Sequence, residues 1–190
     1  MHCHNIPMGP TLIVVSGPPG AGKTTLAHAL AAAIGCPAIC RDEIKEGMVQ
    51  AAAPGFVPAK GDELTARTLP VFFAVLELLL RAGVTTVAEA AFTGKVWRPR
   101  LEPLSGVARF RIVHCTVDPA VAFERSRNRL RDTPTRRAHA DPRDPAEHAA
   151  THRAFDRPSM NVPEIEVDTT DGYRPALAEI VAFAGGRERQ

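Results

Sequence analysis

Residues 17–24 constrain the fold of this chain more than any other stretch. They read Gly-Pro-Pro-Gly-Ala-Gly-Lys-Thr, which is the G-x-x-x-x-G-K-T pattern of a phosphate-binding P-loop. A short apolar, β-branched run at residues 11–15 precedes the loop and is typical of a buried strand. Leu26, Leu30 and Ile34 follow it at intervals of four, as on one face of a helix. The pattern therefore has the context that it requires: a strand, a glycine-rich loop and a helix.

Each part of the loop has a physical role in binding phosphate. Glycine allows backbone angles and close approaches that a Cβ would prevent, so that successive backbone N–H groups can point at phosphate oxygens at a helix N-terminus. We expect Lys23 to reach the β- and γ-phosphates and the Thr24 hydroxyl to ligate Mg²⁺. Thr25 could contact a phosphate or cap its own helix. The predicted nucleotide-binding residues are Gly17, Pro18, Pro19, Gly20, Ala21, Gly22, Lys23, Thr24 and Thr25.

Composition narrows the class of protein. The 190 residues are 45% hydrophobic and 23% charged, which suits one domain with a single core. The net charge of +2 is too close to neutral to indicate nucleic acid or an anionic membrane as an obligate partner. No apolar run approaches the ~20 residues of a membrane span, and no secretion signal opens the chain. Four cysteines without disulfide spacing suit a reducing compartment, so we expect a soluble, cytoplasmic protein.

Predicted strands and helices alternate along the chain. The strands are expected at residues 11–15, 36–40, 84–88, 110–115 and 165–167, and the helices after the P-loop, over 42–53, from 62 to Gly83, weakly over 97–104, after Asp118 and over 173–184. This alternation predicts an α/β fold with a parallel sheet covered by helices on both faces. Right-handed crossovers then bring the carboxyl ends of all strands to one edge, where ligands bind.

The boundaries of the domain follow from the same pattern. We expect residues 1–190 to form one domain, with a disordered leader at 1–10, an Arg-rich lid at 125–146 and a frayed tail at 185–190. His2, Cys3 and His4 in the leader look like a metal-binding patch, but a disordered segment is the stronger interpretation. Pro70 is expected to kink or restart the helix that contains it.

Two acidic residues follow strand ends at the same edge as the P-loop. Asp42 could act as a general base for an acceptor hydroxyl, or it could only cap its helix. Glu89 could hold the water shell of Mg²⁺ or bind the acceptor, or it could be an ordinary loop carboxylate. Arg41 and Lys45 are either solvated charges or ligands of an anionic or polar acceptor.

An arginine-rich stretch follows the fourth predicted strand. Its members are Arg125, Arg127, Arg129, Arg131, Arg136, Arg137 and Arg143. Arg125 and Arg129 lie four residues apart on one helix face and could both point at the phosphates as a charge clamp. The alternative is a solvated basic surface, and we expect the clamp for one or two of the seven. His139 and His148 show no partner in the sequence and receive no role.

Several segments together resemble the small P-loop kinases. They are the P-loop itself, RDEIK at 41–45, VAEAAF at 87–92, the DP…R…R pattern from Asp118, and VDTTDGY at 167–173. The closest group in this resemblance is the AAA_33-type ATP-binding proteins, which are related to the 5′-kinase domain of polynucleotide kinase and to chloramphenicol phosphotransferase. The resemblance covers residues 11–184, and its most specific element is the P-loop.

The resemblance implies a fold and a set of roles. The fold is a three-layer P-loop NTPase domain whose five parallel strands have the order 2-3-1-4-5. Asp42 would be the catalytic base, Lys45 would contact the substrate, and residues 168–172, beginning at Asp168, would lie near the adenine. Arg125 and Arg129 would bind phosphate from the lid. Polynucleotide kinases usually carry Arg at the position of Lys45 and Asp at the position of Glu89, and both departures argue against a polynucleotide acceptor.

Three functions fit these residues. The first is an ATP-dependent kinase that uses Mg²⁺ and transfers the γ-phosphate of ATP to a hydroxyl of a small molecule. The second is a polynucleotide or nucleoside 5′-hydroxyl kinase, against which the near-neutral charge and the single Trp and Tyr count. The third is a nucleotide-dependent ATPase or switch module without an acceptor. The predicted catalytic residues are Lys23, Asp42, Arg125 and Arg129; Arg41, Lys45 and Glu89 would bind substrate, Thr24 the metal, and Asp168 the nucleotide.

Overall fold

A computed structural model describes residues 9–51, 57, 59, 62–132, 135, 138, 139 and 144–185 of this chain. Most of the predicted leader, the residues of the predicted tail after Gly185 and much of the predicted lid lie outside these residues. Among the described residues no helix is both long enough and apolar enough to cross a membrane.

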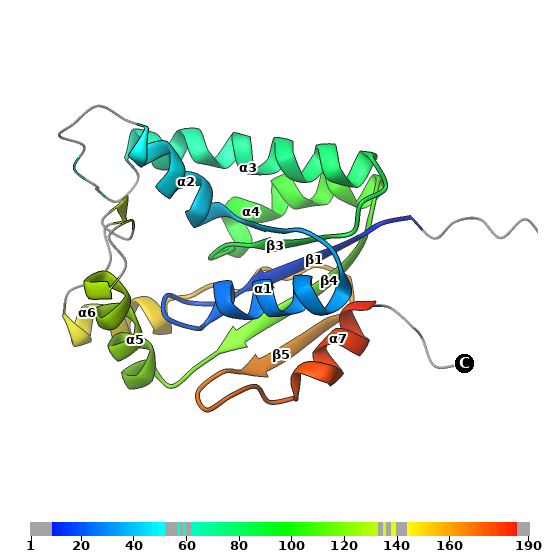
Figure 1. Ribbon diagram of the computed structural model, residues 1–190. Helices are drawn as coiled ribbons and strands as arrows, with labels where there is room; N and C mark the ends of the chain where they lie inside the picture. The colour runs from blue at the N-terminus through cyan, green and yellow to red at the C-terminus, as the bar shows by residue number, and fades with distance from the viewer. Residues whose placement is uncertain are drawn as a thin grey trace, which may run out of the picture.

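Five parallel strands form the central sheet (Figure 1). They are β1 (Thr11–Ser16), β2 (Ala38–Cys40), β3 (Thr86–Glu89), β4 (Arg109–Thr116) and β5 (Glu164–Asp168). Their order across the sheet is β2-β3-β1-β4-β5, which confirms the predicted order and the predicted P-loop NTPase fold. In the register, Val15 of β1 lies opposite Glu89 of β3 on one side and opposite Val113 of β4 on the other. The carboxyl end of β3 therefore lies beside the start of the P-loop.

Helices cover both faces of the sheet. They are α1 (Lys23–Ile34), α2 (Arg41–Gln50), α3 (Glu63–Arg81), α4 (Gly94–Leu101), α5 (Pro119–Asp132), α6 (Pro145–Arg153) and α7 (Leu177–Gly185), and a 3₁₀ turn, η1 (Glu102–Gly106), follows α4. Figure 1 shows α1 and α7 in front of the sheet, with α3 and α4 above and behind it. Near the carboxyl edge, α5 and α6 pack against each other.

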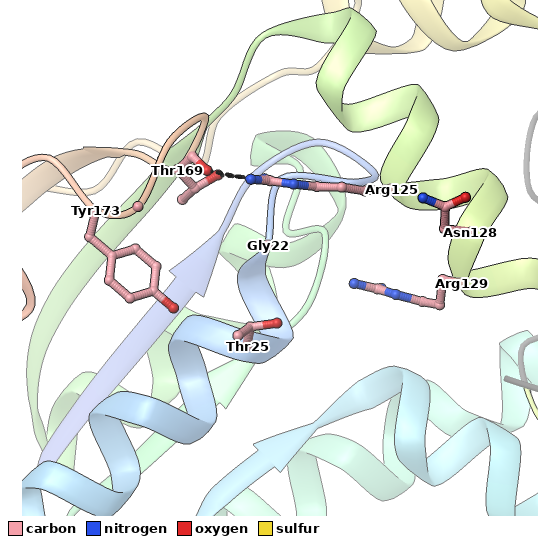
Figure 2. Close-up of a pocket in the computed structure, with 8 residues that line it drawn as sticks. Gly22, Thr25, Arg125, Asn128, Arg129, Thr169 and Tyr173 are labelled. Carbon is pink, nitrogen blue, oxygen red and sulfur yellow. Dashed lines mark hydrogen bonds between the residues drawn. The ribbon is translucent and has the colours of Figure 1, made fainter. Parts of the chain in front are cut away.

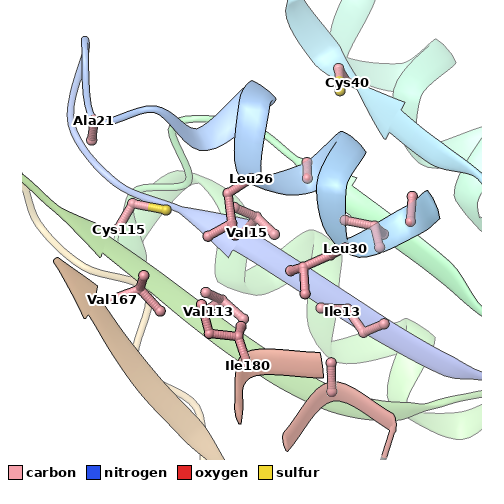
Figure 3. Packing of buried hydrophobic residues seen from close by; sticks show 14 residues of the cluster. Ile13, Val15, Ala21, Leu26, Leu30, Cys40, Val113, Cys115, Val167 and Ile180 are labelled. Carbon is pink, nitrogen blue, oxygen red and sulfur yellow. The ribbon is translucent and has the colours of Figure 1, made fainter. Parts of the chain in front are cut away.

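Two hydrophobic cores hold the three layers together, one on each face of the sheet. Strand β1 contributes to both, because successive side chains of a strand point to opposite faces. Ile13 and Val15 lie in the first core, and Leu12 and Val14 lie in the second. The first core also contains Leu26, Leu30, Val113, Val167 and Ile180 (Figure 3). The second also contains Phe72, Leu76, Leu80, Phe92, Trp97 and Leu101.

Helix boundaries differ from the prediction at two places near the site. Helix α2 begins at Arg41 with Cys40 as its N-cap, so Asp42 lies in the first turn and is not the cap. Helix α3 does not restart at Pro70 but runs from Glu63 to Arg81. A single missing N–H and the local distortion around Pro70 are outweighed by the burial of the apolar face of α3.

Helix α6 was not predicted. The prolines between residues 132 and 146 favoured a loop, but Pro145 occupies the first turn of a helix, where its missing N–H is not needed. Asp144 is the N-cap, and its side chain accepts a hydrogen bond from the Ala146 N–H at 2.6 Å. The sequence signal, a capping residue before a proline, is the same one that predicted the start of α5 at Asp118 and Pro119.

Candidate active site

The P-loop connects β1 to α1 and is packed tightly against two other elements. Gly20 has a φ of 76°, and a Cβ there would lie 2.4 Å from the carbonyl oxygen of Ala122 in α5. A Cβ at Gly17 would lie 2.5 Å from the carbonyl oxygen of Cys115 in β4. Both distances are far below van der Waals contact. Glycine is therefore required at these positions by the fold as well as by any phosphate.

Lys23 lies at the first position of α1, and its side chain folds back over the loop. Its Nζ donates a hydrogen bond to the carbonyl oxygen of Pro18 at 2.9 Å. The Ala21 N–H donates to the same carbonyl at 3.2 Å, which closes the turn within the loop. The Lys23 ammonium is thus held close to the backbone that would surround a phosphate.

Thr24 and Glu89 are in direct contact. The Thr24 Oγ1 donates a hydrogen bond to Glu89 Oε2 at 3.2 Å, and Glu89 is only 3% exposed. A hydroxyl and a carboxylate oxygen at the edge of a phosphate loop are the hard ligands that Mg²⁺ takes together with water and phosphate oxygens. These two side chains could therefore hold Mg²⁺, and sequence reasoning named both of them.

Asp42 lies one strand further along the same edge. Its carboxylate accepts a hydrogen bond from Arg41 Nη1 at 3.0 Å and is 34% exposed. His139, which comes from the segment between α5 and α6, places its Nδ1 3.9 Å from Asp42 Oδ2 and its Nε2 3.1 Å from Glu46 Oε1. The imidazole, 8% exposed, therefore joins the predicted lid to the first turns of α2. This contact could not be predicted from the sequence, because His139 and Asp42 lie far apart along the chain.

Lys45 is buried, in contrast to its expected position on a substrate surface. The residue is 2% exposed, and its Nζ lies 2.7 Å from Asp62 Oδ2 at the N-terminus of α3. Burial raises the pKa of Asp62, but hydrogen bonds from Lys45 and from the Thr65 N–H lower it more, to about 2. The Asp62 carboxylate is therefore ionised at neutral pH, and its ion pair with Lys45 joins α2 to α3 beneath the edge that carries Asp42.

A pocket of about 430 Å³ opens on the other side of the P-loop (Figure 2). Its walls come from the P-loop end of α1, from α5 and from the segment after β5. The lining residues are Gly22, Thr25, Arg125, Asn128, Arg129, Thr169, Gly172 and Tyr173. The size suits a nucleoside, and the walls combine one aromatic ring with polar groups, as small-molecule sites do.

The two predicted arginines have different environments in this pocket. Arg125 Nη2 donates to the carbonyl oxygens of Thr169 at 2.7 Å and Thr170 at 3.1 Å, and its Nη1 donates to Thr169 Oγ1 at 3.3 Å. Arg125 therefore joins α5 to the segment after β5. Figure 2 shows Arg129 extending from the same helix into the pocket, beside Arg125.

The segment after β5 forms the far wall. The Oγ1 of Thr169 is hydrogen-bonded to the carbonyl oxygen of Thr116 in β4 at 3.1 Å and to that of Ala21 in the P-loop at 3.2 Å. Asp168, the predicted nucleotide ligand, accepts a hydrogen bond from the Thr170 N–H at 2.8 Å, and hydrogen bonds from Thr170 lower its pKa. The pocket is lined by Thr169 and Tyr173 rather than by Asp168. Tyr173 is the one tyrosine of the chain, and the VDTTDGY segment was the signal for it.

Helix α6 contacts the outer side of the P-loop through His152. Its Nε2 lies 2.6 Å from the carbonyl oxygen of Pro19, and its ring packs against that of His148 with centroids 4.6 Å apart. Burial lowers the pKa of His152; the contact with Pro19 opposes this shift, and the charge of Lys23 adds to it. A neutral imidazole that donates its N–H to the Pro19 carbonyl is the state that these contacts favour. Since α6 was not predicted, this support of the loop was missed.

Comparison with known proteins identifies a family. The profile of the AAA_33 family, described as an AAA domain, matches residues 12–158. Comparison with curated protein sequences gives no match.

Solved structures share the fold. A candidate kinase from Chloroflexus aurantiacus J-10-fl superposes with a TM-score of 0.83 at 24% identity, over 96% of this chain and 100% of that one. A gluconokinase from Sinorhizobium meliloti 1021 gives 0.54 at 24% identity, over 93% and 90% of the two chains. The APS kinase of Mycobacterium tuberculosis, in complex with AMPPNP and APS, gives 0.61 at 14% identity, over 95% and 100%. At these identities the similarity shows a shared fold.

Proposed function

This chain belongs to the AAA_33 family, and from that premise we propose that it is an ATP-dependent kinase that transfers the γ-phosphate of ATP to a hydroxyl group of a small molecule. The observation that carries the proposal is the contact between Thr24 and Glu89 at the P-loop, with Asp42 on the neighbouring strand end. Phosphoryl transfer to an acceptor requires groups that hold the metal ion and a separate residue that orients or deprotonates the attacking hydroxyl. Side chains able to take both roles lie on this edge of the sheet.

The nucleotide would occupy the P-loop and the adjoining pocket. The backbone N–H groups of the loop and Lys23 would bind the phosphates, and the base and ribose would enter the pocket between Tyr173 and helix α5. Thr24 and Glu89 would hold Mg²⁺, which neutralises charge on the phosphates when it is bound. Arg129, which extends into the pocket, would add positive charge near the transferred group.

The acceptor would bind on the Asp42 side of the loop. Asp42 would accept the proton of the acceptor hydroxyl as that oxygen attacks phosphorus. Arg41 Nη1 donates a hydrogen bond to one carboxylate oxygen of Asp42, and His139 Nδ1 lies 3.9 Å from the other. The buried Nε of Arg41 has no hydrogen-bond partner among the described residues, so a polar group of the acceptor could satisfy it. Lys45 would act indirectly, by fixing α2 to α3 from inside.

The acceptor class can be tested directly. Purified protein would be incubated with ATP, Mg²⁺ and a panel of sugars, sugar acids, nucleosides, amino alcohols and a 5′-hydroxyl oligonucleotide, and phosphorylated products identified by mass spectrometry. We expect a phosphate monoester of one small-molecule class, lost in Lys23→Ala and reduced at least a hundredfold in Asp42→Asn. Asp156→Asn, a substitution in the segment after α6, is the matched control.

Two results would contradict the proposal. Transfer to the oligonucleotide alone, with rates that fall steeply with salt, would indicate a polynucleotide acceptor. Hydrolysis of ATP to ADP and phosphate with every acceptor, unchanged by Asp42→Asn, would indicate an ATPase or switch module in which Asp42 is not a base.

A further inference from the structure

Three potential metal ligands from different elements meet beside β2. They are His28 in the middle of α1, Cys40 at the last position of β2 and Glu43 in the first turn of α2. All three ligand atoms lie within 4.8 Å of one another. His28 Nε2 is 2.7 Å from Glu43 Oε1 and 3.8 Å from Cys40 Sγ. None of the three lines the nucleotide pocket or belongs to the P-loop.

The spacing of the atoms is close to that of a tetrahedral zinc site. Zinc binds sulfur at about 2.3 Å, nitrogen at about 2.05 Å and oxygen at about 2.1 Å, so tetrahedral angles place nitrogen about 3.6 Å from sulfur and about 3.4 Å from oxygen. The observed separation of 3.8 Å between His28 and Cys40 already fits. His28 and Glu43 would have to move apart by less than 1 Å from their hydrogen-bonded separation.

The burial of the three side chains allows this adjustment. Cys40 is 2% exposed and is fixed by the sheet, since it pairs with Glu89 in the register of β2 and β3. The side chains of His28 and Glu43 are 51% and 48% exposed and can turn about their χ angles. An ion held between them would face solvent on its open side, where water can supply the fourth ligand.

The chemistry of the ligands selects the class of ion. A thiolate, an imidazole and a carboxylate together suit Zn²⁺ and other borderline ions, whereas Mg²⁺ requires oxygen ligands. The Thr24–Glu89 pair offers only oxygen ligands, as Mg²⁺ requires. The two neighbouring sites would therefore not compete for the same ion.

We propose that His28, Cys40 and Glu43 bind one Zn²⁺-class ion, with water as the fourth ligand. The ion would link α1, β2 and α2 at the base of the turn that carries Asp42. It replaces the thiol proton, which leaves to solvent as the Zn–S bond forms.

Cobalt provides the direct probe. The full-length protein, reduced and free of chelators, would be titrated with Co²⁺ and its absorption recorded. We expect one equivalent to give the visible bands of tetrahedral Co²⁺ and a near-ultraviolet thiolate-to-cobalt charge-transfer band, both abolished by one equivalent of Zn²⁺. Because His2, Cys3 and His4 could bind metal themselves, the same titration is run on a chain in which all three are alanine.

Variants assign the ligands. Cys40→Ser should abolish the charge-transfer band, and His28→Ala and Glu43→Gln should each weaken Co²⁺ binding at least tenfold, as measured by competition with a chromophoric chelator. Cys36→Ser is the matched control, because Cys36 lies just before β2 and outside the cluster, and it should leave the band unchanged. His28 and Glu43 are exposed enough that their variants should fold even if Cys40→Ser does not.

Three results would overturn the site: no tetrahedral Co²⁺ spectrum in the protein with an altered N-terminus, a charge-transfer band that survives Cys40→Ser, or affinity unchanged in both His28→Ala and Glu43→Gln. Each readout is spectroscopic and is independent of any kinase activity.

Discussion

Glu89 accepts a hydrogen bond from Thr24 at 3.2 Å although the two residues are 65 positions apart in the chain. The contact follows from the sheet order. Strand β3 is the neighbour of β1, and Glu89 lies opposite Val15, two residues before the P-loop begins. The buried carboxylate of Glu89 therefore lies beside the first turn of α1, where the Thr24 hydroxyl is located. A carboxylate and a hydroxyl are both ligands that Mg²⁺ accepts.

Glu89→Gln tests the role of this carboxylate. The amide keeps the shape but loses the charge, so we expect the rate of phosphoryl transfer at saturating ATP to fall at least tenfold and the Mg²⁺ concentration for half-maximal rate to rise. The measurement is the initial rate over a Mg²⁺ titration. Glu77→Gln, an exposed carboxylate of α3, is the control and should behave as wild type. An unaltered Mg²⁺ dependence in Glu89→Gln would remove Glu89 from the metal site.

Lys45 and Asp62 should contribute strongly to stability. Lys45→Met leaves the Asp62 carboxylate buried without its cation, and removal of one partner from a buried pair costs about 3–5 kcal/mol of unfolding free energy. The double variant Lys45→Met, Asp62→Asn should recover most of the loss, because no uncompensated charge is left. Urea denaturation of the four proteins measures the coupling. Additive effects of the two substitutions would show that the pair does not act as a unit.

The same pair predicts a pH dependence. The pKa of Asp62 is lowered from its ordinary value of 3.8 to about 2 in the folded protein, so the folded state favours the charged form. Its contribution, about 2 kcal/mol, is complete above pH 4 and is lost as the pH falls toward 2. Unfolding free energies of wild type and Asp62→Asn should therefore converge between pH 4 and pH 2. A constant difference over this range would contradict the assignment.

Local patterns predicted the fold because they were strong and mutually consistent. The P-loop between a buried strand and an amphipathic helix, together with the alternating apolar segments, predicted a parallel sheet with helices on both faces. The family resemblance added the order of the strands. The contacts between side chains were harder to predict from the sequence than the fold. Lys45 appeared to be a surface cation, because its partner, Asp62, lies 17 residues further along the chain. His139 and His152 contact Asp42 and Pro19 only through the tertiary fold.

Gly20 should be intolerant of substitution for reasons that do not depend on ATP. Gly20→Ala places a Cβ 2.4 Å from the Ala122 carbonyl oxygen and imposes an L-residue on a φ of 76°. We expect a loss of about 2 kcal/mol or more in unfolding free energy without nucleotide. Gly47→Ala is the control: it lies within α2 with open space at its Cβ, and should raise stability by about 0.5–1 kcal/mol. Equal stabilities of the two variants would contradict the close contact between the P-loop and α5.

Substitutions of Arg125 and Arg129, the α5 arginines that line the pocket, should have different kinetic effects. Arg125 makes three hydrogen bonds to Thr169 and Thr170, and a lysine cannot reproduce this forked geometry. Arg125→Ala and Arg125→Lys should both raise the KM for ATP about tenfold, because the wall of the pocket is no longer held to α5. Arg129 extends into the pocket, so Arg129→Ala should mainly lower kcat, by tenfold or more, and Arg129→Lys should recover part of the rate.

Steady-state kinetics with ATP varied at saturating acceptor separate these effects. Arg127→Ala, an exposed residue of the same helix paired with Glu124, is the control and should change neither constant. If Arg125→Ala lowered kcat with KM unchanged, Arg125 would act on the transferred phosphate rather than on the pocket wall. If Arg129→Ala changed only KM, Arg129 would bind ground state and transition state equally, and the positive charge at the reacting group would have to come from another residue of the lid.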